Sequence, residues 1–179
     1  MVACTITYLE MNAAPELPPL QAPVQEPFDR LALMRAEHPS VSFYRYLYDA
    51  VGRAWLWTDR KLLSDADVAA IIEDDGVEIY VAYVAGVPAG FAELDLRNAP
   101  DIHLSYFGLM PEFIGHGLGS YLLNWVIRRA WEREPERMTV TTNNFDHPRA
   151  LRLYQRMGFV AHARRVVQID PDPDPPTPA

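Results

Sequence analysis

The chain has 179 residues, of which 49% are hydrophobic and 22% are charged, and its formal net charge at pH 7 is −8. This length and composition predict one domain with a single core. The acidic balance argues against nucleic acid or an anionic membrane as a partner, because phosphate binding needs clustered lysines and arginines. Cys4 is the single cysteine, and no Cys/His spacing typical of a metal site occurs, so we expect no disulfide, no metal and a reducing compartment.

No run of residues reaches transmembrane length, and the first residues lack the basic-then-apolar pattern of a signal peptide. We therefore expect a cytoplasmic protein. Residues 4–10 alternate like a strand, and the prolines that follow predict an extended connector over residues 13–27. Residues 28–36 and the aromatic-rich residues 40–57 are predicted to be helical, and Ser64 is typical of the residue that caps a third helix.

Three strands follow in quick succession, over residues 77–85, 87–96 and 102–109, and predict an antiparallel meander. The remaining elements are a helix, a strand, a short helix and a last strand, over residues 117–133, 138–142, 146–157 and 159–169. This mixed order predicts an α/β (α+β) fold with a mostly antiparallel central sheet flanked by helices. The domain covers residues 1–170, and the Pro/Asp-rich residues 171–179 are predicted to be disordered.

A glycine-rich segment joins the third strand of the meander to the next helix. Gly115, Gly117 and Gly119 lack a Cβ atom, so the backbone can take positive φ values and a ligand can approach its amides. The N–H groups that open the helix lack internal acceptors and lie at the positive end of its dipole. The spacing fits neither the dinucleotide motif nor the P-loop, and it fits better a coenzyme with a pyrophosphate and a 3′,5′-ADP.

The second informative segment, residues 146–159, has the pattern of a short helix. Asp146 is a favourable N-cap, and Gly158 suits the position after the helix end. Four residues are predicted to form a stripe that faces the sheet: Ala150, Leu153, Tyr154 and Met157. Tyr154 is the polar member of this stripe, and the pattern alone is equally met by a core tyrosine with a bonded hydroxyl.

Together these segments resemble the GNAT superfamily of acyl-CoA-dependent N-acetyltransferases, whose signature is Gln/Arg-x-x-Gly-x-Gly/Ala after a strand that ends Val-x-Pro. Residues 109–111, Leu-Met-Pro, stand for the strand end, and residues 117–119 supply the glycines. Ile114 replaces the Gln or Arg. The family's Asn-x-x-Ala-x-x-Leu-Tyr-x-x-x-Gly-Phe segment matches over residues 150–159, with His147 in place of its Asn.

The resemblance implies a GNAT fold over about residues 3–169, with acetyl-CoA bound where the central strands splay apart. It implies that the Tyr154 phenol protonates the departing CoA thiolate. His147 or Asn144 would replace the pantetheine contact of the missing Asn, or either residue caps a loop. The predicted cofactor-binding residues are Phe107, Gly108, Leu109, Ile114, Gly115, His116, Gly117, Leu118, Gly119, Ser120, Asn144 and His147.

The central strands offer two candidates for the base that deprotonates the acceptor. Strand alternation places Ile102, Leu104 and Tyr106 on one face and His103, Ser105 and Phe107 on the other, with a bulge expected at Gly108. His103 is the first candidate, because the resemblance places it where relatives carry a catalytic Glu or His. Glu93 is the second. A structural histidine and a solvent-facing glutamate are the competing interpretations.

We therefore expect an N-acetyltransferase that moves an acetyl group from acetyl-CoA to a primary amine by direct attack. No Ser-His-Asp or Cys-His arrangement supports an acyl-enzyme. The acceptor is a small molecule or a peptide amine. One alternative is a non-catalytic acyl-CoA-binding sensor or interaction module of the same fold, and another is a structural domain whose glycine-rich turn binds nothing. The resemblance also leaves a homodimer open.

Overall fold

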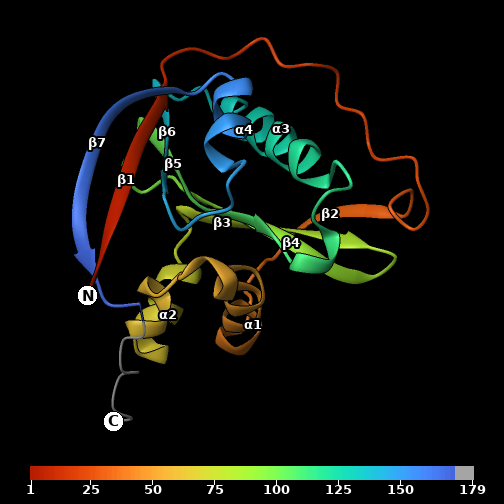
Figure 1. Ribbon diagram of the computed structural model, residues 1–179. Helices are drawn as coiled ribbons and strands as arrows, with labels where there is room; N and C mark the ends of the chain where they lie inside the picture. The colour runs from red at the N-terminus through yellow and green to blue at the C-terminus, as the bar shows by residue number, and fades with distance from the viewer. Residues whose placement is uncertain (172–179) are drawn as a thin grey trace.

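The computed structural model describes residues 1–171, which form one twisted seven-stranded sheet in the order β2-β3-β4-β5-β6-β1-β7 (Figure 1). Of the end that the sequence predicts to be disordered, residues 172–179 lie outside the described residues. The strands are β1 Val2–Met11, β2 Leu31–Arg35, β3 Val77–Val84, β4 Val87–Asp95, β5 Asp101–Leu109, β6 Arg137–Asn143 and β7 Val160–Ile169. The α-helices are α1 Val41–Gly52, α2 Asp65–Ile72, α3 Leu118–Trp131 and α4 Ala150–Arg156, with short 3-10 turns at Arg53–Trp55, Asp59–Leu62 and Pro111–Phe113.

The predicted mixed sheet is confirmed. Strands β5 and β6 run parallel, whereas the other neighbouring strands pair antiparallel, including the meander of β3, β4 and β5. Figure 1 shows α3 and α4 over one face of this sheet and α1 and α2 over the other. Each face has its own buried core, one including Leu122 of α3 and the other Leu47 of α1. No helix within residues 1–171 is long and apolar enough to cross a membrane.

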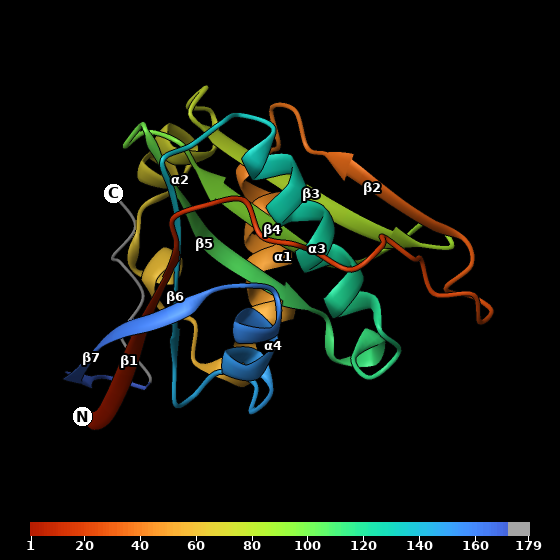
Figure 2. The ribbon, with the colours of Figure 1, turned by 90° about the horizontal axis from the view of Figure 1, so that it is seen from above.

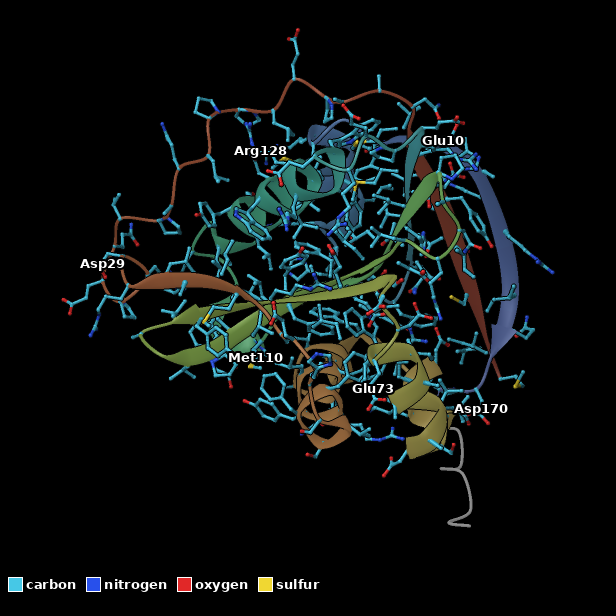
Figure 3. The ribbon with its side chains drawn as sticks, turned by 180° about the vertical axis from the view of Figure 1, so that it is seen from behind. Glu10, Asp29, Glu73, Met110, Arg128 and Asp170 are labelled. Carbon is cyan, nitrogen blue, oxygen red and sulfur yellow. The ribbon has the colours of Figure 1, made fainter. Side chains whose placement is uncertain are left out.

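The irregular connector after β1 is fixed to the outer side of α3. Asn124 donates from Nδ2 to the carbonyl of Pro18 over 3.0 Å, and Arg128, labelled in Figure 3, donates from Nη2 to the same carbonyl over 2.9 Å. Proline has no N–H group to donate to a sheet, and the two side chains satisfy the Pro18 carbonyl instead, so the connector lies on the helix without regular structure.

The prediction of a helix over residues 28–36 is wrong. Residues 31–35 form the edge strand β2, in which Leu31 lies opposite Val84 of β3. Leu31 and Leu33 pack against the core beneath α3, so the apolar residues alternate with the period of a strand. The pattern is short enough to fit either structure, and pairing with the otherwise free edge of β3 decides it.

The helix predicted over residues 40–57 is shorter in the structure. Ser40 caps α1 by accepting a hydrogen bond from the Phe43 amide over 3.2 Å. The helix ends at Gly52, and Leu56 takes a left-handed conformation with φ of 55°. This turn brings Trp57 back against Gly52, where a Cβ atom would lie 2.5 Å from Trp57 Cβ. The chain then continues into the 3-10 turn at Asp59–Leu62.

The predicted alternation along β5 is also wrong beyond Leu104. Glu93 lies opposite Tyr106, but Leu94 lies opposite Leu104, so Ser105 is an extra residue that forms a bulge. Tyr106 consequently packs with the core beneath α1, on the face opposite to Leu104. The bulge predicted at Gly108 therefore lies three residues earlier.

Candidate active site

The site begins where two neighbouring strands separate. Pairing between β5 and β6 runs from Asp101 opposite Arg137 to Leu104 opposite Val140 and then stops. Figure 2 shows the two strands diverging beyond this point. A cavity of about 1020 Å³ opens there, bordered by both strands, the start of α3, α4 and the segment between α1 and α2. The sequence elements predicted to carry the chemistry therefore meet around one cavity.

The edge of β5 that faces this opening presents free backbone groups. The Met110 amide donates to the carbonyl of Ala89 over 2.8 Å, so residues 110 and 108 direct their backbone groups toward β4. In an antiparallel pair the intervening residues point the other way. The amides of Phe107 and Leu109 therefore face the open edge, and both residues line the cavity. An extended ligand can pair with this edge as an additional strand would.

The glycine loop, residues 114–120, leads into the N-terminus of α3. Gly115 and Gly117 have φ values of 96° and 81°, which side chains disfavour, and Gly117 is the N-cap without a side-chain bond. Ile114, Gly115, Gly117, Gly119 and Ser120 line the cavity. The amides of the first helical turn have no acceptor within the helix, so the loop presents donors and positive dipole charge to the cavity.

Gly119 is informative because the protein itself does not require a glycine there. Its φ lies outside the left-handed range, and an added Cβ atom would meet only Leu109 Cδ1, at 3.6 Å. A glycine inside a helix lowers stability by roughly 0.5–1 kcal/mol relative to alanine. The missing side chain therefore leaves the backbone of the first helical turn uncovered where it lines the cavity.

Two predicted members of the loop direct their side chains elsewhere. The His116 ring stacks on Phe28 with 4.4 Å between ring centres. Leu118 is fully buried in the core beneath α3. Neither residue is part of the cavity lining that the structure describes, so these side chains fix the loop from outside and leave the contacts to its backbone.

Tyr154 reaches the cavity from α4. Its side chain is only 5% exposed, and its ring packs edge-on against Phe107 and Phe159 at 6.1 and 5.9 Å. Its hydroxyl has no hydrogen-bond partner among residues 1–171. Every fully buried side-chain polar atom in this range has a partner, so the Tyr154 hydroxyl is accessible from the cavity that the residue lines. Burial raises the pKa of Tyr154, so the phenol keeps its proton at neutral pH.

The start of α4 differs from the prediction. Arg149, and not Asp146, is the N-cap of α4. Asp146 instead accepts hydrogen bonds from the Thr142 hydroxyl over 2.8 Å and from the Asn143 amide over 2.9 Å. The carboxylate thereby closes the turn after β6, and the helix starts one turn later than the capping pattern indicates.

His147 and Asn144, the two substitutes for the family's Asn, lie in different places. His147 borders the cavity, accepts the Arg149 amide at Nδ1 over 3.1 Å and packs its ring edge-on against Trp55. Asn144 accepts the Thr5 amide over 2.6 Å, which ties it to β1 and away from the described lining. Of the two, only His147 is placed to contact a ligand in the cavity.

His103 borders the cavity beside the last β5–β6 pairs. Its Nδ1 lies 2.8 Å from the Thr139 hydroxyl, which leaves Nε2 as the nitrogen available for proton transfer. Burial lowers the pKa of His103, and the nearby Asp95 carboxylate partly opposes this change. The imidazole is therefore neutral, as a base must be, at pH 7.

Glu93 does not border the cavity in the described structure, and it does not face solvent either, because it is 1% exposed. Its carboxylate accepts hydrogen bonds from the Tyr44 hydroxyl over 2.5 Å and from Arg60 Nη2 over 2.8 Å. The structure thus brings His103 and Tyr154 to the cavity and places Glu93 behind Arg60.

Comparison with known families gives this arrangement its context. A model of the GNAT acetyltransferase family matches residues 40–159, well over half of the chain. The chain belongs to the GNAT acetyltransferase family. No protein in a comparison with curated sequences matches it.

Solved structures show the same GNAT fold at low sequence identity. A functionally unknown conserved protein from Staphylococcus epidermidis has a TM-score of 0.60 and 18% identity over 92% of this chain, which spans only 60% of that protein. An aminoglycoside acetyltransferase from an uncultured soil metagenomic sample has a TM-score of 0.62 and 14% identity, with 79% of this chain and 95% of the neighbour covered. The aminoglycoside N-acetyltransferase AAC(6′)-Iy in complex with CoA has a TM-score of 0.55 and 21% identity, with 78% and 93% covered.

Several residues of this GNAT cavity carry no recognisable motif. Tyr48, Trp57, Arg60 and Tyr106 border it beneath α1. The sequence shows the aromatic-rich stretch, but most of these rings are equally typical of a core. Arg149, Arg152 and Arg156 border the cavity from one face of α4, and none of these exposed side chains has an acidic partner among residues 1–171. Basic residues near the glycine loop are the signal for them, although a solvated helix face has the same pattern.

Proposed function

We propose that the protein is an acetyl-CoA-dependent N-acetyltransferase that acetylates a primary amine by direct attack. The observation that carries the proposal is the convergence on one cavity of an open helix N-terminus, a free strand edge and the unbonded Tyr154 hydroxyl. The thioester of acetyl-CoA supplies the activated acetyl group. GNAT neighbours that act on aminoglycosides support the reaction class and do not specify the acceptor.

The residues present fit the cosubstrate. The missing side chain at Gly119 leaves the first turn of α3 accessible to a pyrophosphate, and Gly115 and Gly117 supply the backbone conformation of the loop. The three arginines of α4 face the same cavity and suit further phosphate charge. The outward amides of Phe107 and Leu109 suit the amides of a pantetheine arm and, by family analogy, steady a developing oxyanion.

Proton transfer is assigned to two residues of this chain. His103 accepts a proton from the acceptor ammonium at Nε2, directly or through a water, and Thr139 orients the ring through Nδ1. Tyr154 donates its phenolic proton to the leaving sulfur and regains one from the attacking nitrogen, which loses its remaining extra proton as it becomes an amide. Burial raises the pKa of Tyr154 and keeps the donor form populated. Glu93 has no part in this proposal as a base, because its carboxylate is already bound by Arg60 and Tyr44.

The cosubstrate site is tested by calorimetry with acetyl-CoA on wild type, Gly119→Gln and Gly119→Glu. The two side chains have similar size, and neither strains the backbone, so their difference isolates the charge. We expect Gly119→Glu to bind about 10-fold more weakly than Gly119→Gln, because a carboxylate repels the pyrophosphate. Gln21→Glu in the exposed connector is the control and should bind like wild type.

Absence of acetyl-CoA binding by wild type, or equal affinities of the two Gly119 variants, would overturn the proposed cosubstrate site. Thiol release with a panel of primary amines then tests the reaction. Tight binding without release for any amine would favour an acyl-CoA-binding sensor of the same fold. The cytoplasmic location, the homodimer and the extent of the domain stay predictions.

A further inference from the structure

Arg60 is a cavity residue that the proposed chemistry does not use. It lies in the 3-10 turn Asp59–Leu62, between α1 and α2. Nη2 donates to Glu93 Oε1 over 2.8 Å, Nε donates to the Tyr44 hydroxyl over 3.1 Å, and Cζ lies 5.0 Å from the centre of the Tyr106 ring. Three contacts thus fix a side chain that is 15% exposed.

The fixed guanidinium keeps free donors. A guanidinium has five N–H groups, and Nη1 has no hydrogen-bond partner among residues 1–171. Because no fully buried side-chain nitrogen or oxygen there lacks a partner, Nη1 lies at an accessible surface. Arg60 also borders a smaller hollow, together with Lys61. Its guanidinium, however, lies over Tyr106, which borders the main cavity and not the smaller one. The guanidinium that carries these donors therefore lies beside the main cavity.

Burying the Glu93 carboxylate costs free energy, and its role in holding Arg60 beside the cavity explains why the charge is there. Glu93 is 1% exposed, and a charged group is expensive to bury unless it is paired and hydrogen-bonded. If Arg60 were absent, an apolar residue would fill this buried β4 position without that cost. With Glu93 and Tyr44 in place, Arg60 is held ready for an anion, which lowers the entropy that binding would otherwise cost.

The residues around Arg60 indicate what kind of molecule carries the anion. Tyr106 lies just beyond the point at which β5 leaves β6, so Arg60 sits beside the opening on the α1 face, opposite to Tyr154. Tyr48, Trp57 and Tyr106 form an aromatic cluster with ring centres 5.0–5.4 Å apart. Two other charged residues are engaged with each other there: Arg97 donates to Asp95 through Nε and Nη2. Asp59 is exposed at the rim.

We propose that Arg60 binds a carboxylate of the acceptor, so that the acceptor is an amino acid whose aromatic or apolar side chain packs against Tyr48, Trp57 and Tyr106. This inference rests on the proposed N-acetyltransferase function. Glu93 and Tyr44 are positioning residues, because they act through Arg60. A bidentate guanidinium–carboxylate contact selects such acceptors against amines of the same shape that lack the charge.

The test compares L-phenylalanine, L-phenylalaninamide and 2-phenylethylamine as acceptors for the wild-type protein, after calorimetry has shown that acetyl-CoA binds. We expect kcat/KM for the amino acid to exceed that for the other two by about 10- to 100-fold. Equal values for the three compounds, or a preference for 2-phenylethylamine, would overturn the inference and leave the proposed function standing. Failure of acetyl-CoA binding would instead remove the proposed function.

Variants then locate the effect. Arg60→Gln should remove the preference for the amino acid, and Arg60→Lys should keep part of it. Glu93→Gln should raise KM for L-phenylalanine with little change in kcat and leave the amide unaffected, a split that loss of stability alone would not produce. Lys61→Gln, which removes the same charge from the neighbouring residue outside the main cavity, should behave like wild type. An equal loss of the amino-acid preference in Lys61→Gln would show that the overall positive charge, and not a direct Arg60–carboxylate contact, causes the preference. That result would overturn the inference.

Discussion

Leu104 of β5 lies opposite Val140 of β6, and this pair is the last that joins the two strands. The residues are only 1% and 2% exposed, so tight packing holds the sheet together up to this point. Beyond it both strands continue, and β5 keeps hydrogen bonds on the β4 side alone. A free strand edge is normally covered or interrupted in proteins. Here the free edge lies inside the sheet and borders the cavity.

Tyr154→Phe tests the assigned acid. The ring packing against Phe107 and Phe159 is retained, and no protein hydrogen bond is lost, so the fold and the affinity for acetyl-CoA should be unchanged. We expect kcat to fall about 100-fold, within the usual contribution of a positioned proton donor. Thiol-release kinetics and calorimetry on the same preparation measure the two quantities.

Tyr80→Phe is the matched control, because Tyr80 is also buried but its hydroxyl binds Glu78 and Arg129 away from the cavity. This variant should lose stability and keep kcat. A Tyr154→Phe variant as active as wild type would rule out the phenol as the obligatory donor.

The pH dependence tests His103. Its pKa is depressed by burial, so the neutral, active imidazole persists at pH 7, and kcat/KM should fall only as the pH drops below the ordinary histidine value of 6.5. His103→Asn should lose most of the activity together with this acidic limb. Profiles of kcat/KM against pH for both proteins make the comparison, and an unchanged acidic limb in the variant would assign it to another group.

The same depressed pKa links His103 to stability. The unfolded chain protonates His103 near its ordinary value of 6.5, whereas the folded protein resists protonation. The unfolded state therefore binds more protons as the pH falls through this value, and the free energy of unfolding decreases. Urea unfolding should show a steeper loss between about pH 7 and about pH 5 in wild type than in His103→Asn. Parallel losses would show that other groups dominate.

The residues that sequence reasoning placed correctly belong to local patterns. The positive φ values of Gly115 and Gly117 and the helix that carries Tyr154 follow from backbone preferences and spacing within a few residues. The predicted helix over residues 28–36 was wrong because β2 depends on pairing with β3, about fifty positions away in the sequence.

Arg60 was missed for a related reason. Its bond to Glu93 joins residues 33 positions apart, across the turn that follows the end of α1 at Gly52. The bulge at Ser105 turns Tyr106 toward α1, where it lies beneath the guanidinium. Neither event has a strong sequence signal. The bulge also interrupts the alternation from which the two faces of β5 are predicted. The position of Tyr106 beside Arg60, on the α1 face, therefore cannot be read from the sequence.

The stability of the Arg60–Glu93 pair can be measured apart from catalysis. Glu93→Ala leaves the partly buried Arg60 charge uncompensated, so we expect the free energy of unfolding to fall by about 3 kcal/mol. The double variant Glu93→Gln/Arg60→Gln removes both charges and should be more stable than Glu93→Ala. Urea unfolding of Glu93→Gln, Arg60→Gln and the double variant gives the coupling energy. Additive effects would show that the pair contributes no interaction of its own.

Gly108→Ala tests how closely α1 approaches the open strand. A Cβ atom at this position would lie 2.5 Å from Val51 Cγ1, and overpacking of this kind costs about 1–3 kcal/mol of unfolding free energy. Val51→Ala should relieve the clash, so the double variant should be more stable than the sum of the single effects predicts. At Gly90 the clash would be with the Gly108 carbonyl oxygen at 2.4 Å, and the backbone cannot be trimmed. Val51→Ala should therefore fail to rescue Gly90→Ala, and equal rescue of both glycine variants in urea unfolding would show that α1 does not set the space above β5.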